Sequence, residues 1–288
     1  MPTIRLGGVP EHFNYPWHFA IINGYFQQKG IEIEWHDYPG GTGAMALDLR
    51  SNRLDMALLL TEGAIREISD EAPFKIVGTF VESPLTWGIH TASANQKANT
   101  EKLGDMKYAI SRKGSGSHLM AYVHAYENGS SLLEEQMIVV HDLKGAITSL
   151  QANETDLFLW EKFTTKPYID AGKLKRIGEF PSPWPCFVLV AREEWLFSHS
   201  RWANEVIEVI HDTIRELLLD KPTLIDRISS KYTLAPQDVS AWLEVTKWSL
   251  ETTVSEKMLQ KVQFHLSELG LSKKIASDYL VHDKNKLN

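Results

Sequence analysis

The chain has 288 residues, 43% of them hydrophobic and 10% aromatic, and a formal net charge of −7 at pH 7. This composition excludes a largely disordered protein, and a negative chain with scattered Lys and Arg is not expected to bind nucleic acid. The one cysteine, Cys186, excludes an internal disulfide and a cysteine-based metal cluster, and no run approaches the ~20 apolar residues of a membrane-spanning helix.

Short strands and helices alternate through the first half of the chain. The apolar patterns predict strands at 4–9, 31–38, 54–60 and 74–81, and helices at 17–29, 44–51 and 62–69. Such an alternation is typical of a parallel sheet with helices on both faces. After a looser stretch at 91–100 the pattern restarts, with strands at 107–111, 136–140, 156–160 and 174–180 and helices at 117–127, 143–153 and 163–171.

The prolines of 181–185 interrupt this second unit. One more strand is expected at 187–191, and beyond it the chain is almost entirely helical. The expected helices are 202–219, 222–231, 236–250 and 256–269, and their apolar faces are typical of helices that cover a core.

Three stretches carry a resemblance to a known family. They are the helix-to-strand entry GYFQQKGIEIEW at 24–35, the glycine turn at 40–45, and RSNRLDMALLLTEG at 50–63. Over about two-thirds of its length the chain resembles the type II periplasmic binding protein fold, in its NMT1/THI5-like branch, which binds nitrate, alkanesulfonates and thiamine-precursor pyrimidines. It is most similar to a group of bacterial and fungal members without an export signal.

The resemblance implies an α/β fold of two lobes that close over a small molecule, with a helical C-terminal region. Residues 1–87 and 188–288 would form lobe I, and residues 88–187 would form lobe II. The site would lie between the lobes, where loops follow the carboxyl ends of the strands.

The residues at these strand ends are the candidate ligand-binding residues. They are Glu11, His12, Asn14, Gly41, Thr42, Gly43, Thr61, Glu62, Ser83, Gly114, Ser115, Gly116, Ser117, Trp160, Glu161 and Trp184. The glycines permit close backbone approach, the helix starts offer N–H groups, and a Trp ring can stack on a planar solute. Each also has a purely structural alternative: a surface turn, a helix cap or, for Trp184, a wedge between the lobes.

Other sites are less favoured by the sequence. Arg112 and Lys113 add positive potential beside the turn at 114–117 or point to solvent. Residues 41–46 match G-x-G-x-x-A, but the surrounding pattern does not fit a dinucleotide site. His118 and His124 are not spaced as a metal pair on one helix face, so neither a metal nor a cofactor is expected.

We expect a solute-binding protein whose ligand is polar and planar, such as an aminopyrimidine related to thiamine synthesis. Carboxylates at the cleft would repel a simple anion. An enzyme on the same fold that acts on a small heterocyclic or acidic metabolite, with Glu62 paired to His12 or Glu161, and a metabolite sensor without a transport role are the alternatives.

The N-terminal residues lead directly into a strand, without a signal-peptide pattern. A cytoplasmic location is expected if the sequence is full length, and a periplasmic or lipid-anchored one if a signal was removed. An exported form would have an ABC transporter permease as its partner.

Overall fold

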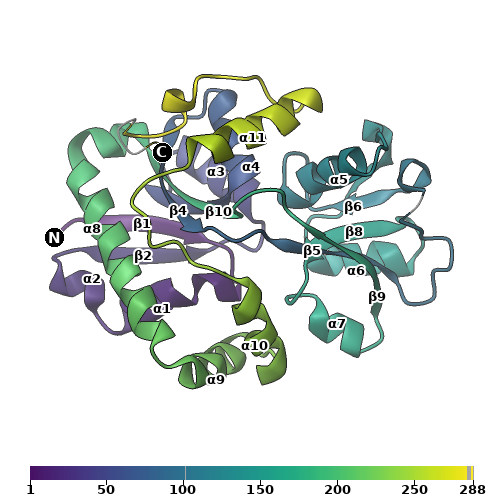
Figure 1. Cartoon of the computed structure of the whole chain (residues 1–288), viewed down its shortest axis with the longest axis horizontal. Helices are drawn as coiled ribbons and strands as arrows, with labels where there is room; N and C mark the ends of the chain where they lie inside the picture. The colour runs from purple at the N-terminus through teal and green to yellow at the C-terminus, as the bar shows by residue number, and fades with distance from the viewer. Residues whose placement is uncertain (101, 284–286, 288) are drawn as a thin grey trace.

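Two five-stranded sheets organise residues 1–100, 102–283 and 287, which the computed structural model describes (Figure 1). The sheet of lobe I has the order β2 (Glu32–Asp37), β1 (Thr3–Gly8), β3 (Met56–Leu60), β10 (Phe187–Arg192) and β4 (Phe74–Val81). The sheet of lobe II has the order β7 (Met137–Val139), β6 (Tyr108–Ile110), β8 (Leu157–Glu161), β5 (Thr86–Ala92) and β9 (Leu174–Pro181).

Eleven α-helices in the described part of the chain surround the two sheets. Those of lobe I are α1 (Tyr15–Ile22), α2 (Tyr25–Gln28), α3 (Thr42–Arg50), α4 (Thr61–Ser69), α8 (Glu193–Leu218), α9 (Lys221–Tyr232), α10 (Pro236–Val245) and α11 (Glu256–Glu268). Those of lobe II are α5 (Gly116–Glu127), α6 (Leu143–Gln151) and α7 (Lys166–Asp170). No described helix is long and apolar enough to cross a membrane.

The central strands of lobe I are continuous apolar runs. Met56 to Leu59 in β3 and Val188 to Ala191 in β10 are buried. Strands without a solvent-facing side need helices on both faces of their sheet. The packing of α3 and α4 on β3, and of α8 on β4 and β10, meets this need.

The expectation of a parallel sheet is wrong in one respect. Strands β1, β2 and β3 are parallel, but β10 lies antiparallel between β3 and β4. In lobe II, β5 lies antiparallel between β8 and β9 in the same way. The chain leaves lobe I after β4 and returns to it as β10, so each sheet contains one strand that runs against its neighbours.

Several helix bounds differ from the sequence-based expectation. The helix expected at 17–29 is broken into α1 and α2 at Gly24, whose φ of 71° ends the first helix. Helix α8 begins at Glu193 and bends at His199, and α10 ends at Val245.

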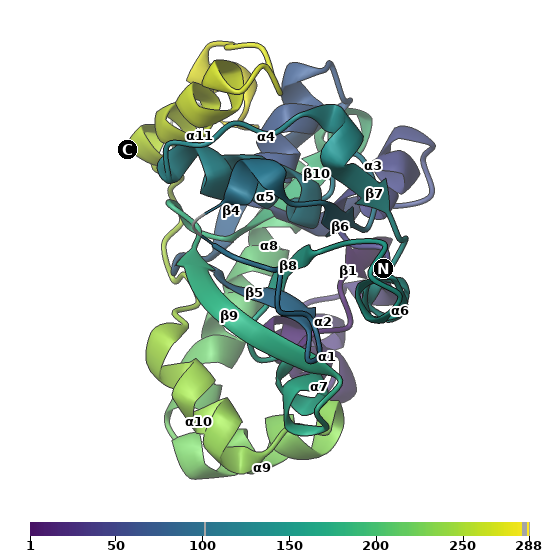
Figure 2. The same ribbon diagram turned by 90° about the vertical axis from the view of Figure 1, so that its right-hand side faces the viewer.

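Two short segments, 82–85 and 182–186, link the lobes, a few residues before the expected boundaries. The C-terminal region belongs to lobe I. Helix α8 packs on α1, α11 packs on α4, and Trp248 forms a β-bridge with Val81 at the edge of the sheet. Figures 1 and 2 place α9 and α10 at one end of the molecule and α11 at the other.

Candidate functional site

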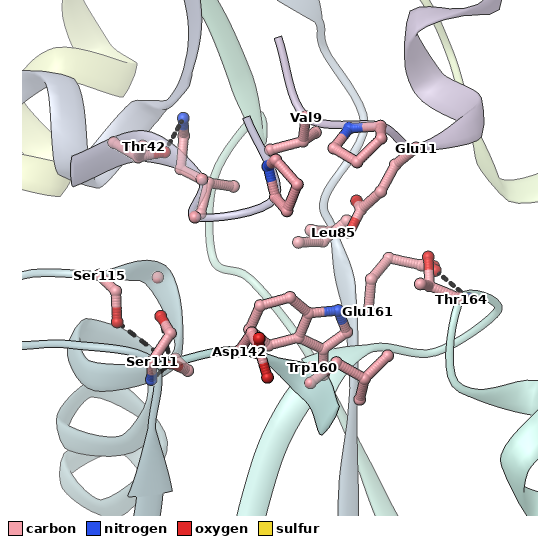
Figure 3. Close-up of a pocket in the computed structure, with 18 of the residues that line it drawn as sticks. Val9, Glu11, Thr42, Leu85, Ser111, Ser115, Asp142, Trp160, Glu161 and Thr164 are labelled. Carbon is pink, nitrogen blue, oxygen red and sulfur yellow. Dashed lines mark hydrogen bonds between the residues drawn. The ribbon is translucent and has the colours of Figure 1, made fainter. Parts of the chain in front are cut away.

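A cavity of about 310 Å³ lies between the lobes, at the carboxyl ends of β1, β3, β6 and β8 (Figure 3). Eight of the candidate residues line it, namely Glu11, Gly41, Thr42, Ser115, Gly116, Ser117, Trp160 and Glu161. The turns before α3 and before α5, which are far apart in sequence, therefore line the same cavity from opposite lobes. Whether these residues bind a ligand stays a prediction.

The lobe I wall is shaped by the turn before α3. Gly41 has φ 68° and ψ −159°, a conformation that is essentially restricted to glycine. The next residue, Thr42, accepts a hydrogen bond through Oγ1 from the backbone N–H of Leu60, at 3.0 Å. This bond joins the end of β3 to the start of α3, so the first turn of the helix is held at the cavity.

The lobe II wall is held by serine side chains at the start of α5. Ser115 caps the helix, and Ser117 Oγ accepts from the backbone N–H of Ser111 at 3.0 Å. The hydroxyls of Ser115 and Ser117 are also 3.1 Å apart. These hydroxyls are thus engaged with the turn itself, which orients the helix start toward the cavity.

Two carboxyl groups, one from each lobe, line the cavity. Glu161 is 3% exposed, and its Oε2 accepts from the backbone N–H of Thr164 at 2.6 Å. Burial raises the pKa of Glu161 to about 7. Burial, together with the nearby charge of Glu161, raises the pKa of Glu11 to about 8, although the Trp160 indole partly offsets this. The pair can therefore hold a proton near neutral pH and accept N–H groups when ionised.

Trp160 supplies a flat apolar surface beside these carboxyl groups. Its ring stacks on Phe158, with centroids 5.1 Å apart and an interplanar angle of 23°. Figure 3 shows the indole in the cavity, with Glu11 and Glu161 to one side and Ser111 and Ser115 to the other. A ring system placed here would have polar groups at both ends and an aromatic face beneath it.

The other eight candidates lie outside the cavity lining, and several of their polar groups have partners elsewhere in the fold. Asn14 donates to the carbonyl of Val9, Thr61 donates to the carbonyl of Pro185, and Ser83 accepts from the N–H of Lys247. His12 packs on Trp242 in the core, with ring centroids 4.3 Å apart.

The remaining four also lie outside the lining. Trp184 and Glu62 are buried and hydrogen-bonded to each other. The N–H of Gly114 donates to Nδ1 of His118, and Gly43 packs against the side chain of Arg112.

The structure also separates the two basic residues beside the turn at 114–117. Arg112 lines the cavity, whereas Lys113 is exposed and pairs with Glu134. Asp142, which follows β7 and caps α6, and Lys144 also line the cavity, as do Leu85 and Trp87. Glu161 was selected by the strand-end rule, which takes residues at or just after the carboxyl end of a strand as candidates. Arg112 and Asp142 also follow strands, so the same rule could have identified them as lining residues. In the described part of the chain, no group of three His, Cys, Asp or Glu side chains could hold a metal ion.

Comparisons with known proteins define the class of fold. The family profile of "Ca3427-like PBP" matches residues 87–180. The Candida albicans CA3427 gene product, which defines a family with the generic periplasmic binding protein fold, is 27% identical with a TM-score of 0.90, covering 100% of this chain and 96% of its own. The expected two-lobed α/β architecture is confirmed: the chain has the type II periplasmic binding protein fold.

Solute-binding proteins are among the more distant structural neighbours. The alkanesulfonate-binding protein SsuA from Xanthomonas axonopodis pv. citri, bound to MOPS, is 13% identical with a TM-score of 0.79, over 99% of this chain and 98% of its own. The ligand-binding component of an ABC-type import system from Staphylococcus aureus is 15% identical with a TM-score of 0.75, over 98% and 97%. A search of curated proteins found no significant match.

Proposed function

We propose that this chain is a small-molecule binding protein whose lobes close over a polar, planar ligand. The observation that carries the proposal is the Trp160 ring, placed in a cavity of about 310 Å³ between two lobes of this fold. A cavity of this size, with an aromatic face and a few convergent polar groups, is typical of a small-molecule site.

The carboxyl groups of Glu11 and Glu161 favour a ligand with N–H donors. Both lie in a partly dehydrated site, where an unpaired carboxylate is costly and an amino-substituted ring would supply its hydrogen bonds. We therefore propose an aminopyrimidine, the ligand class of the thiamine-precursor branch that the sequence resembles. A simple anion such as nitrate would face repulsion from both groups.

The role of the neighbours in uptake supports a transport partner. The neighbour from Staphylococcus aureus is part of an ABC-type import system. We propose an ABC transporter permease as the partner of an exported form of this chain.

Isothermal titration tests the ligand proposal. The protein is first unfolded and refolded to remove any bound molecule, and is then titrated with 4-aminopyrimidines and with matched pyrimidines lacking the amino group. We expect only the amino compounds to bind, and Trp160→Ala to weaken binding roughly tenfold or more through the lost ring contact. Phe197→Ala is the control, since Phe197 is 94% exposed. Binding of neither series, with no small molecule found by native mass spectrometry of the untreated protein, would refute the proposal.

A further inference from the structure

Arg112 extends from lobe II to lobe I beside the cavity. It follows β6 in the sequence, yet its guanidinium lies against the turn before α3. A Cβ atom added at Gly43 would lie 2.7 Å from Nε of Arg112, and one added at Gly40 would lie 3.1 Å from Nη1. The absence of a side chain at these positions therefore lets the guanidinium pack directly against this turn.

The guanidinium has no anionic partner among the described residues. Its Nε and Nη2 atoms are buried and form no hydrogen bond, and no described carboxylate lies within ion-pair distance of it. Burial alone accounts for the lowered pKa of Arg112. A partly buried cation without a partner is costly, and the positive end of the nine-residue helix α3 lies next to it.

The unpartnered atoms lie on one edge of the guanidinium. Nε and Nη2 present parallel N–H groups that match two oxygens of one oxyanion. Arg5 in the same chain uses this edge, with its Nε and Nη2 donating to the two carboxylate oxygens of Asp55 at 2.9 and 2.6 Å. The corresponding edge of Arg112 faces no such group.

We infer that the ligand is bipolar, with an oxyanion bound by Arg112 at one end of the cavity and an amino group bound by Glu11 and Glu161 at the other. In Figure 3 the α3 and α5 turns lie on one side of Trp160 and the two glutamates lie on the opposite side. The distribution of charge thus matches a planar ring with an amino group and a carboxylate, sulfonate or phosphate on opposite edges. This inference rests on the proposed function of the cavity and adds the anionic group to it.

A matched pair of probes with the two groups on opposite ring positions tests it: 2-aminopyrimidine-5-carboxylate and the corresponding neutral carboxamide. For the unchanged protein we expect the carboxylate to bind at least tenfold more tightly than the carboxamide. In Arg112→Gln this ratio should fall to near one, and Arg112→Lys should retain only part of it because one ammonium replaces two parallel donors. Arg201→Gln is the control and should keep the full ratio, since the Arg201 side chain is 78% exposed on α8.

Benzoate is a second probe, because it carries the anion without the amino group. We expect it to bind weakly to the unchanged protein and not to Arg112→Gln, with circular dichroism showing that the variant is folded.

If the carboxamide binds but the carboxylate does not bind more tightly, the oxyanion inference is wrong and the proposed function stands. If benzoate binding depends on Arg112 while no amino compound binds, the aminopyrimidine proposal is wrong and the anion site stands. Equal carboxylate binding by Arg112→Gln and the unchanged protein would also overturn the inference.

Discussion

The Nε1–H group of Trp184 donates a hydrogen bond of 2.9 Å to Oε2 of Glu62, and both side chains are buried. This bond ties the segment that returns from lobe II to the start of α4 in lobe I. The other carboxyl oxygen, Oε1, is buried without a hydrogen-bond partner among the described residues. Burial raises the pKa of Glu62 to about 7, so the neutral acid is the form that the fold accommodates best.

Glu62→Gln should make the protein more stable in mild alkali. A carboxyl group whose pKa is higher in the folded state stabilises the protein fully at pH values below its unfolded-state pKa of about 4.5. This contribution to the free energy of unfolding is lost as the pH rises through about 7. The loss amounts to about 3 kcal/mol above pH 8. Gln keeps an acceptor for Trp184 and cannot ionise. The free energy of unfolding of the Glu62→Gln protein should therefore not fall over this pH range. Urea unfolding at pH 5, 7 and 8.5 measures the difference, with exposed Glu208→Gln as the control; parallel pH profiles for Glu62→Gln and the unchanged protein would contradict it.

Ligand affinity should rise with pH between about 6 and 9. The pKa values of Glu161 and Glu11 are raised to about 7 and about 8, so both are largely protonated at pH 6 and ionise across this interval. Ionised carboxylates accept N–H groups more strongly, and we expect roughly a tenfold gain for an amino ligand that does not itself titrate there. Titration calorimetry across the interval, repeated with Glu161→Gln, should show a smaller gain in the variant. A flat profile for the unchanged protein would argue against contact between the ligand and the carboxylates.

Gly116→Ala should hold the lobes apart. A Cβ atom at this position would lie 2.3 Å from Cδ1 of Leu60 in lobe I and 2.8 Å from the ring of Trp87 in lobe II. Overpacking of this kind costs about 1–3 kcal/mol, and opening of the cleft is the simplest way to relieve it. We expect a larger radius of gyration by small-angle X-ray scattering and at least tenfold weaker ligand binding. Gly104→Ala is the matched control because its Cβ atom would meet no described atom closer than 3.6 Å; an unchanged radius with full affinity would show that the site tolerates the methyl group.

Glu127→Ala should weaken the closed state moderately. Oε1 of Glu127, at the end of α5 in lobe II, lies 2.8 Å from Nε2 of His265 on α11, which packs against α4 of lobe I. The carboxylate is partly exposed, so the pair should contribute no more than about 1 kcal/mol. A two- to fivefold rise in the ligand dissociation constant is expected, with little change in the midpoint of thermal unfolding. A fall in that midpoint of more than several degrees would instead assign the pair to folding.

Part of this architecture could be read from local pattern alone. The bounds expected for β4 match those observed, and the apolar runs of β3 and β10 identified buried strands. The strand-end rule selected Glu161 and Trp160, which line the cavity. The same rule also selected His12 and Thr61, whose side chains turn into the protein, because strand position does not determine which partners a side chain finds.

The sequence by itself determined which segments are buried, where most helices and strands begin and end, and that the chain contains two α/β units in tandem. These follow from hydrophobic periodicity and turn chemistry, which act over a few neighbouring residues. Only the tertiary structure decided that β10 runs against its neighbours and that Arg112 reaches across to the turn at 40–43. Strand order and the pairing of charges depend on contacts between residues far apart in the chain, and one sequence carries no local signal of them.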